Sequence, residues 1–296
     1  VMYVWFEALL NRSTAWSPHI IDSGVETVHH FVGTGDFDLD EDVDVASSEM
    51  QQGTNPDEVK IYLNDGAGNS WTKFLLSSLG SHSNKVVDID NDGDLDLFGA
   101  NHDNPDQVKL WVNNVSTGTT PLSLDLWTYI QVDNNRVHDN PNYQKAFGLA
   151  MGDVNNDALG DIVSGKYIYT NLGGDMTSWA ETTFPRADFD ALLIVDVDGD
   201  SNKDVVGMNT IGEVIWMENN GGTWSQLLVA DIGISDHAIS SQGYAAAELY
   251  SGGAEKKEIV LTNGGLRVLQ IPSVPISSWT VNTLDASGVV EGIAVG

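Results

Sequence analysis

The chain has 296 residues, no cysteine and a formal net charge of −30 at pH 7. Its length allows one large domain or two smaller ones, and no disulfide can hold them. The charge disfavours nucleic acid, because proteins bind phosphates through Lys and Arg, and it disfavours anionic membranes. No stretch reaches the roughly 20 apolar residues of a membrane span. We therefore expect neither nucleic-acid binding nor membrane insertion.

The first predicted element is a strand over residues 2–7. Glu7 ends its apolar run and no basic leader precedes it, so the segment does not have the pattern of a signal peptide. From residue 28 onward the chain repeats with a period of about 50 residues, which is typical of propeller blades. Each repeat reads as strand A, an Asp-rich loop, strand B, strand C and strand D.

The repeats give the following predicted elements in chain order. Strand A is expected at 30–35, 85–87, 147–152, 192–195 and 244–247, and strand B at 43–46, 95–99, 162–164, 205–207 and 259–261. Strand C is expected at 59–64, 108–113, 167–171, 214–218 and 266–270. Strand D opens with a tryptophan, for which we predict packing between blades: Trp16, Trp71, Trp127, Trp179, Trp224 and Trp279.

Four nine-residue loops separate the predicted A and B strands: Asp36–Asp44, Asp88–Asp96, Asp153–Asp161 and Asp196–Asp204. Each has an oxygen-bearing side chain at positions one, three, five and nine. Alternate side chains of an extended loop point inward, and Ca²⁺ takes six to eight oxygen ligands. Position seven would supply its backbone carbonyl. The alternative interpretation is acidic surface turns without a metal.

The candidate metal ligands follow from these positions. They are Asp36, Asp38, Asp40, Asp42, Asp44, Asp88, Asp90, Asp92, Asp94, Asp96, Asp153, Asn155, Asp157, Leu159, Asp161, Asp196, Asp198, Asp200, Asn202 and Asp204.

Position six of each loop is where the chain must turn sharply. This position is glycine only at Gly93. In the other loops it is Glu41, Ala158 or Ser201, which predicts strained turns or less tightly closed metal sites there. An EF-hand is disfavoured, because position twelve is never the Glu that an EF-hand requires and strands flank the loops. A fifth candidate, Glu248–Glu258, is degenerate and too long to count as a site.

The ends of the sequence read as incomplete blades. Residues 290–296 resemble a strand A without an Asp loop, so 1–27 and 288–296 are interpreted as partial blades of a single propeller over 1–296. Unpaired edges beside a gap are costly, which favours a chain cut out of a longer one. Five whole and two partial blades then predict seven blades, with a six-bladed ring closed by its ends as the alternative.

The Asp loops, together with Phe98-Gly99, resemble the FG-GAP or VCBS repeats of calcium-binding propellers such as the integrin α-subunit head. The resemblance implies an all-β propeller with about four structural Ca²⁺ ions in the A–B loops. It also implies a secreted or surface-exposed protein. Similar repeats occur in secreted binding proteins, in some polysaccharide lyases and in a sugar dehydratase, so the repeats alone do not specify a function.

Polar residues that differ between repeats mark the end of each blade opposite the Asp loops. The candidates there are Glu49, His102, Lys166 and Tyr167. We expect this face to bind a polysaccharide or an extracellular protein ligand. The alternative is a lyase or dehydratase with His102 or Lys166 as base and Tyr167 as acid, and with Arg136 or a metal neutralising charge. A metal site of His30, Glu49 and His102 has no sequential motif behind it.

Overall fold

The computed structural model describes residues 2–7, 15–26, 28–50, 53–101, 107–116, 122–134, 136, 148–173, 175–185, 189–209, 211–233, 240–247, 258–263 and 265–286, with the backbone alone at 30 and 240–247. These residues form an all-β structure, as predicted. The helical structure among them is one 3-10 turn, η1 (Leu124–Leu126). Two compact units, residues 1–135 and 136–296, are each described by themselves.

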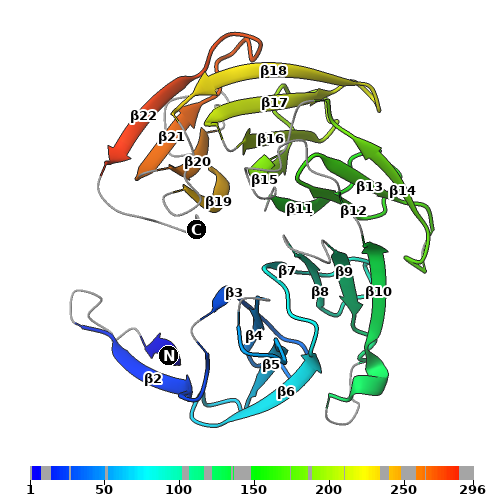
Figure 1. Ribbon diagram of the computed structural model, residues 1–296, viewed down its shortest axis with the longest axis vertical. Helices are drawn as coiled ribbons and strands as arrows, with labels where there is room; N and C mark the ends of the chain where they lie inside the picture. Colours follow the sequence, from blue (N-terminus) through cyan, green and yellow to red (C-terminus); the bar gives the residue numbers. More distant parts are fainter. Residues whose placement is uncertain are drawn as a thin grey trace. The chain divides into compact units, whose positions relative to one another are not determined.

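The first unit contains one two-stranded ribbon and two four-stranded sheets (Figure 1). The ribbon pairs β1 (Tyr3–Glu7) with β2 (Ser17–Asp22). The first sheet consists of β3 (His29–Gly35), β4 (Asp44–Glu49), β5 (Val59–Asn64) and β6 (Trp71–Ser77). The second consists of β7 (Ser83–Val87), β8 (Asp96–Ala100), β9 (Val108–Val112) and β10 (Thr128–Asp133).

The second unit contains three four-stranded sheets. They consist of β11 (Leu149–Gly152), β12 (Asp161–Ser164), β13 (Tyr167–Asn171) and β14 (Trp179–Thr183); of β15 (Phe189–Val195), β16 (Asp204–Asn209), β17 (Glu213–Asn219) and β18 (Trp224–Asp231); and of β19 (Ser240–Ala247), β20 (Glu258–Asn263), β21 (Leu266–Gln270) and β22 (Thr280–Asp285).

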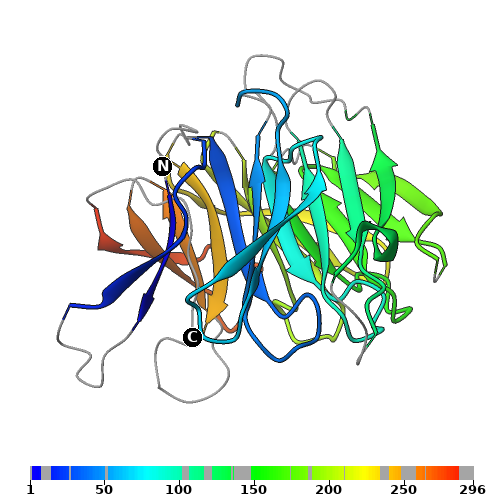
Figure 2. The ribbon, with the colours of Figure 1, turned by 90° about the horizontal axis from the view of Figure 1, so that it is seen from below.

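All five sheets have the same construction, with antiparallel strands side by side in chain order (Figures 1 and 2). The four strands match the predicted A, B, C and D strands, so the predicted blade-like sheets are confirmed. Several strands extend beyond their predicted bounds; β15, for example, begins at Phe189 rather than Leu192. The predicted strand at 290–296 lies outside the described residues.

Burial explains the difference between inner and outer strands. Every residue of β8 and β16 is buried, whereas β14 has three exposed residues among its five. Strand B is covered on both faces and therefore reads as a continuous apolar run. Strand D is mostly exposed or half-buried, because it is the outermost strand of its sheet.

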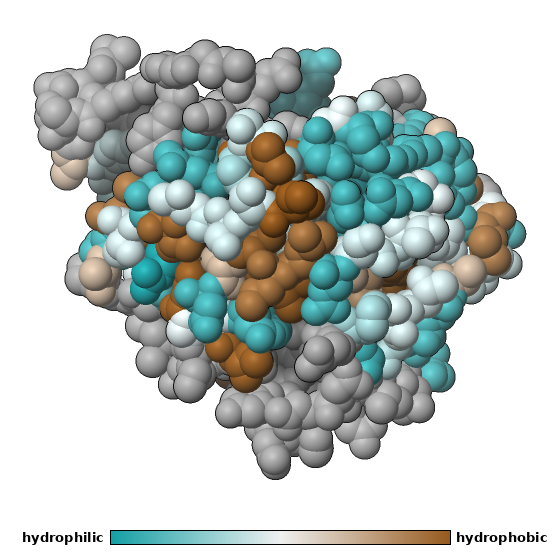
Figure 3. Space-filling model, turned by 90° about the horizontal axis from the view of Figure 1, so that it is seen from above, coloured by the Kyte–Doolittle hydropathy of each residue, from teal (hydrophilic) through white to brown (hydrophobic). Residues whose placement is uncertain are grey.

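Hydrophobic residues also remain exposed at single positions, including Leu228 and Ile276. Figure 3 shows hydrophobic side chains gathered among hydrophilic ones on the face it presents. Apolar atoms normally make up much of a folded surface.

The hydrophobic cores lie between consecutive sheets. In the first unit Phe37, Ala46 and Ile61 of one sheet pack with Leu97 and Trp111 of the next. Four of the six tryptophans predicted to pack between blades join these cores, each contacting a cluster that includes residues of the preceding sheet or ribbon, whereas Trp16 is 49% exposed and the prediction is wrong there. The four that join the cores are Trp71, Trp127, Trp224 and Trp279.

Phe37 provides a test of this core. Its side chain is fully buried between two sheets, so Phe37→Ala should lower the free energy of unfolding by about 3–5 kcal/mol. Val32→Ala, at a residue that is 56% exposed, should change it by less than about 0.5 kcal/mol. Urea unfolding followed by tryptophan fluorescence measures both. Similar losses in the two variants would contradict the proposed packing.

Candidate calcium sites

The ninth-position aspartate fixes each loop to its own sheet. Its two carboxylate oxygens accept backbone N–H groups from the second loop position and from the asparagine at the end of strand C. The distances are 2.7–3.0 Å for Asp44, Asp96, Asp161 and Asp204. All four residues are at most 1% exposed. Burial raises their pKa values, to about 8 for Asp96 and about 6 for the others.

The first-position aspartate closes the tip of the loop. Asp88 accepts the N–H groups of Asp92 and Gly93, both at 3.1 Å, and the loops of Asp36 and Asp153 repeat this pattern. Asp196 instead accepts from Gly199 and Ser201. The fifth-position carboxylate accepts the N–H of the seventh residue in all four loops. These bonds hold several carboxylates on one small loop.

Two left-handed residues shape each loop. Position six has positive φ at Gly93 (101°), Glu41 (75°), Ala158 (71°) and Ser201 (76°), so the turn predicted there is present with or without glycine. Position four also has positive φ, at Leu39, Asn91, Asn156 and Gly199. The sequence analysis did not predict this second left-handed residue. Non-glycine residues in this region carry strain, although Asn tolerates it well.

Three of the loops bring acidic groups within reach of one ion. One ligand oxygen from each residue lies within 4.8 Å of the others in the groups Asp36, Asp38 and Asp40; Asp88, Asp90 and Asp96; and Asp196, Asp198 and Asp204. In the Asp153 loop the third position is Asn155, whose Nδ2 donates to Asp157 at 2.8 Å. The third loop therefore has one negative charge fewer for a cation.

Buried oxygens without hydrogen-bond partners show that the carboxylates fit a cation. Oδ1 of Asp38, Oδ1 of Asp90 and both oxygens of Asp94 are in this state. Asp94 is 1% exposed. Burial, followed by repulsion from Asp92 and Asp90, raises its pKa to about 7. Position seven was predicted to offer its backbone carbonyl; here its side chain is buried as well.

The asparagine at the end of strand C connects neighbouring sheets. Asn113 Nδ2 donates to the carbonyl of Phe37 (2.9 Å), the second position of the Asp loop in the preceding sheet. Asn219 Nδ2 donates in the same way to Val154 (2.7 Å). The apolar side chains at this second position are buried: Phe37, Ile89, Val154 and Val197. Each Asp loop of these sheet pairs is thus both a carboxylate cluster and a junction with the next sheet.

Glu49 lies at the opposite end of β4, in a buried ionic network. Its Oε1 is 2.6 Å from Lys60 Nζ and 3.4 Å from His29 Nε2, and Lys60 also contacts Glu58 at 2.9 Å. Tyr3 hydroxyl bonds to His29 Nδ1 and Ser47 Oγ. Burial, and then the Lys60 charge, lower the pKa of His29.

Lys166 and Tyr167 lie together in the second unit, at the turn between β12 and β13. Lys166 Nζ is 5.7 Å from the centre of the Tyr167 ring, and the two residues are 9% and 5% exposed. Arg136 donates to Ser164 at the end of β12. The structure thus brings Lys166 and Tyr167 together and places Arg136 against the end of the strand that precedes them. Glu49 belongs to the other unit, His102 lies outside the described residues, and for His30 only the backbone is described.

Two lysines in this region were not singled out from the sequence. Lys60 and Lys109 occupy the second residue of strand C in consecutive sheets, and both are buried. Lys109 Nζ donates to the carbonyls of Leu79 (3.1 Å) and Gly80 (2.9 Å), and burial lowers its pKa to about 8. The Val-Lys pair that begins strand C in both sheets could have identified these lysines from the sequence.

Together the fold and the loops define an all-β protein of blade-like sheets with an acidic A–B loop. Residues 36–99 match the family model of the FG-GAP-like repeat, and this segment of the chain is such a repeat. No curated protein matches the chain.

Two solved structures show low similarity. The V. cholerae biofilm matrix protein Bap1 aligns with a TM-score of 0.48 and 12% identity, over 96% of this chain and 42% of that one. The Photorhabdus luminescens Tc holotoxin pore aligns with a TM-score of 0.37 and 14% identity, over 95% of this chain and 13% of that one. The chain therefore spans less than two thirds of either protein.

The strained sixth position can be tested at Ala158. Its φ of 71° is better suited to glycine, so Ala158→Gly should raise the free energy of unfolding by about 1 kcal/mol. Ala180→Gly in β14 should lower the free energy of unfolding by about 0.5–1 kcal/mol, because glycine in the middle of a strand loses more conformational entropy on folding than alanine does. Thermal unfolding of both variants shows the sign, and a loss of stability at both positions would exclude strain at Ala158.

Proposed function

We propose that the protein is a calcium-stabilised, extracellular β-propeller that binds a polysaccharide or protein ligand on the face opposite its Asp loops. The observation behind this is the gathering of buried, unpartnered carboxylates in the loops. Ca²⁺ suits such all-oxygen sites and is abundant outside cells. Among the described residues no helix is long and apolar enough to cross a membrane. In this proposal the sheets are blades of one propeller, seven in number with six as the alternative.

The ion supplies positive charge that offsets the repulsion between the carboxylates of each loop. Positions one, three, five and nine would hold it with their side chains, and position seven with its carbonyl. About four ions are expected, with the Asp153 loop the weakest because it has Asn155 at position three. The role is structural, since the second position of two of the loops accepts a hydrogen bond from the following sheet.

The proposed ligand face consists of the turns between strands B and C. In the second unit it holds Arg136, Lys166 and Tyr167, two cations and an aromatic ring in a protein of net charge −30. Loops on a rigid scaffold commonly carry recognition. A cationic and aromatic group suits acidic or hydroxyl-rich ligands such as polysaccharides.

A carbon–oxygen lyase is the second candidate. It is favoured by one observation, the contact between the Lys166 ammonium and the Tyr167 ring, because β-elimination needs a base, an acid and a neutralising cation. Lys166 or His102 would be the base and Tyr167 the acid.

Calcium removal should lower the melting temperature, and more at pH 8 than at pH 5. The folded-state pKa values of Asp94 and Asp96 are about 7 and 8, above their unfolded value. Their contribution to the stability of the metal-free protein is therefore present at low pH and is lost as pH rises through those values. Ca²⁺ binds the ionised native loops and restores stability by mass action.

Differential scanning calorimetry of metal-free and Ca²⁺-loaded protein at both pH values measures this effect. Asp92→Ala should remove part of the calcium response, whereas Asp125→Ala, in the 3-10 turn away from the loops, should leave it unchanged. If the melting temperature does not change with calcium at either pH value, the loops are not calcium sites.

Ligand binding should depend on Lys166 but not on Lys203, an exposed side chain at position eight of the Asp196–Asp204 loop that is not among the candidate ligands. Lys166→Ala should weaken binding on an array of acidic and neutral glycans by about tenfold, the loss expected for one charged contact. Lys203→Ala is the matched control. A lyase would instead release an unsaturated product that absorbs in the near ultraviolet, and Tyr167→Phe should abolish it. Equal binding by both lysine variants would place the ligand elsewhere.

A further inference from the structure

The chain contains two Asn-Gly pairs, Asn220-Gly221 and Asn263-Gly264, and both belong to the second unit. Asparagine is a thermolabile residue. A glycine after it has no side chain to hinder its backbone nitrogen from reaching the asparagine Cγ atom. The two pairs therefore have the same intrinsic chemistry, and their surroundings decide which of them reacts.

Asn263 is held firmly in place. It is the last residue of β20 and is 5% exposed. Its Nδ2 donates to the carbonyls of Ile232 (3.4 Å) and Gly233 (3.2 Å), and its backbone N–H donates to Gly265 (3.0 Å). Its carbonyl accepts from Arg267 Nε at 3.0 Å. Ring closure at Asn263 therefore requires these bonds to open first.

Asn220 is exposed in the turn between β17 and β18. Its Nδ2 donates to Ser225 Oγ at 3.4 Å, beyond the usual length of an N–H···O bond. Gly221 is exposed too and has a φ of 66°. Within the described part of the chain, the Gly221 N–H has no acceptor. The nitrogen that must attack Asn220 is thus not engaged in another bond.

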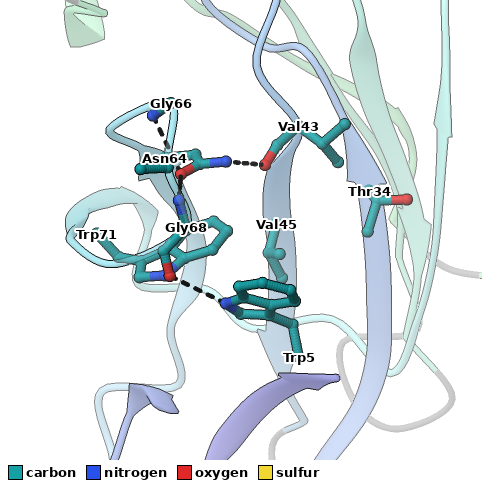
Figure 4. A pocket seen from close by; sticks show the side chains of 9 residues that line it. Trp5, Thr34, Val43, Val45, Asn64, Gly66, Gly68 and Trp71 are labelled. Atoms are coloured by element: carbon teal, nitrogen blue, oxygen red, sulfur yellow. Dashed lines mark hydrogen bonds between the residues drawn. The ribbon is translucent and has the colours of Figure 1, made fainter. Parts of the chain in front are cut away.

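Figure 4 shows the equivalent turn of the first unit, which lines a cavity of about 320 Å³. Asn64 at the end of β5 is the counterpart of Asn219. Its Oδ1 accepts the N–H of Gly66, two residues further on, at 3.2 Å. In the β17–β18 turn the bond to Asn219 Oδ1 comes instead from Gly222, three residues further on, at 2.8 Å. This difference leaves the nitrogen of Gly221 without the bond that Gly66 has.

Asn219, directly before the exposed pair, connects two sheets of the second unit. Its Nδ2 donates to Val154 (2.7 Å) of the preceding Asp loop and to Lys203 (3.0 Å) of its own loop. Its backbone N–H donates to Asp204 at 2.8 Å. The Gly222 N–H holds the other end of the same amide. The length of the turn between Asn219 and Gly222 therefore determines how this amide is oriented.

We propose that Asn220 is a site of spontaneous deamidation and that its isoaspartate product weakens the junction at Asn219. The nitrogen of Gly221 loses its proton to solvent and attacks the Asn220 Cγ atom. The N–Cγ bond forms, the Cγ–Nδ2 bond breaks, and the amide leaves as ammonia. Water then opens the succinimide ring at one of its two carbonyl carbons, which gives aspartate or isoaspartate.

The two products differ in what they do to the turn. Both add one negative charge at residue 220. Isoaspartate also places its Cβ in the main chain, so the path from Asn219 to Gly222 becomes one bond longer. The added bond displaces the Gly222 N–H from Asn219 Oδ1, and the amide that reaches Val154 loses the partner that orients it.

The reaction can be followed in the whole protein, kept in Ca²⁺ at mildly alkaline pH and physiological temperature. Mass spectrometry of the two Asn-Gly peptides should show conversion at Asn220 more than about tenfold faster than at Asn263, which must await local opening. Enzymatic methylation of isoaspartate measures the rearranged product. Asn220→Gln should abolish it, because glutamine forms the larger ring far more slowly. Equal rates at the two asparagines, or faster conversion at Asn263, would overturn the assignment.

Calorimetry of the same samples tests the effect on the junction. The aged protein should gain a second transition several degrees below the first, in proportion to its isoaspartate content. Aged Asn220→Gln should lack this transition, and fresh Asn220→Gln should melt like the fresh wild type. Fresh Asn220→Asp, which adds the charge without the extra main-chain carbon, should also melt close to the wild type. Isoaspartate without a lower transition, or a loss as large in Asn220→Asp, would overturn the coupling to the junction.

Discussion

Each blade-like sheet with an Asp loop depends on one buried carboxylate. The ninth-position aspartate joins the start of the loop to the end of strand C by accepting two backbone N–H groups. An isolated buried carboxylate is costly, but charge-assisted hydrogen bonds to both oxygens offset much of that cost. If this residue were removed, two buried N–H groups would lose their acceptors, and the asparagine that reaches the neighbouring sheet would lose its anchor. The junction between sheets therefore rests on the same side chain that faces the candidate ion.

This arrangement concentrates negative charge where the chain must also pack. Buried oxygens on Asp90 and Asp94 have no hydrogen-bond partner, and burial raises the pKa values of Asp94 and Asp96, so their surroundings disfavour ionisation. The proposed divalent cation would resolve this conflict, because it would interact with several oxygens at once. Metal binding and folding would then be coupled through the same groups.

Much of this was predictable because the repeat has a fixed length. The period of Asp loops and tryptophans located the A, B, C and D strands, and the glycine at position six revealed the left-handed turn. Contacts between repeats were not predictable, since the Asn113 to Phe37 bond joins residues 76 positions apart. The Glu49–Lys60 pair was missed for the same reason: it depends on strands lying side by side rather than on spacing in the sequence. The left-handed fourth position had no common residue to mark it.

The two ends of each sheet therefore differ in how far their side-chain contacts repeat from sheet to sheet. The ninth-position aspartates repeat the same two backbone hydrogen bonds in all four loops, as expected of parts that hold a scaffold together. The opposite ends differ: Lys60 pairs with Glu49, and Lys109 at the same position of the next sheet bonds to carbonyls. In the second unit Lys166, in the turn before β13, lies 5.7 Å from the centre of the Tyr167 ring. A shared scaffold does not determine a ligand. Variation at one end of otherwise equivalent sheets is where a binding specificity particular to this chain can arise without disturbing the junctions that keep the sheets together.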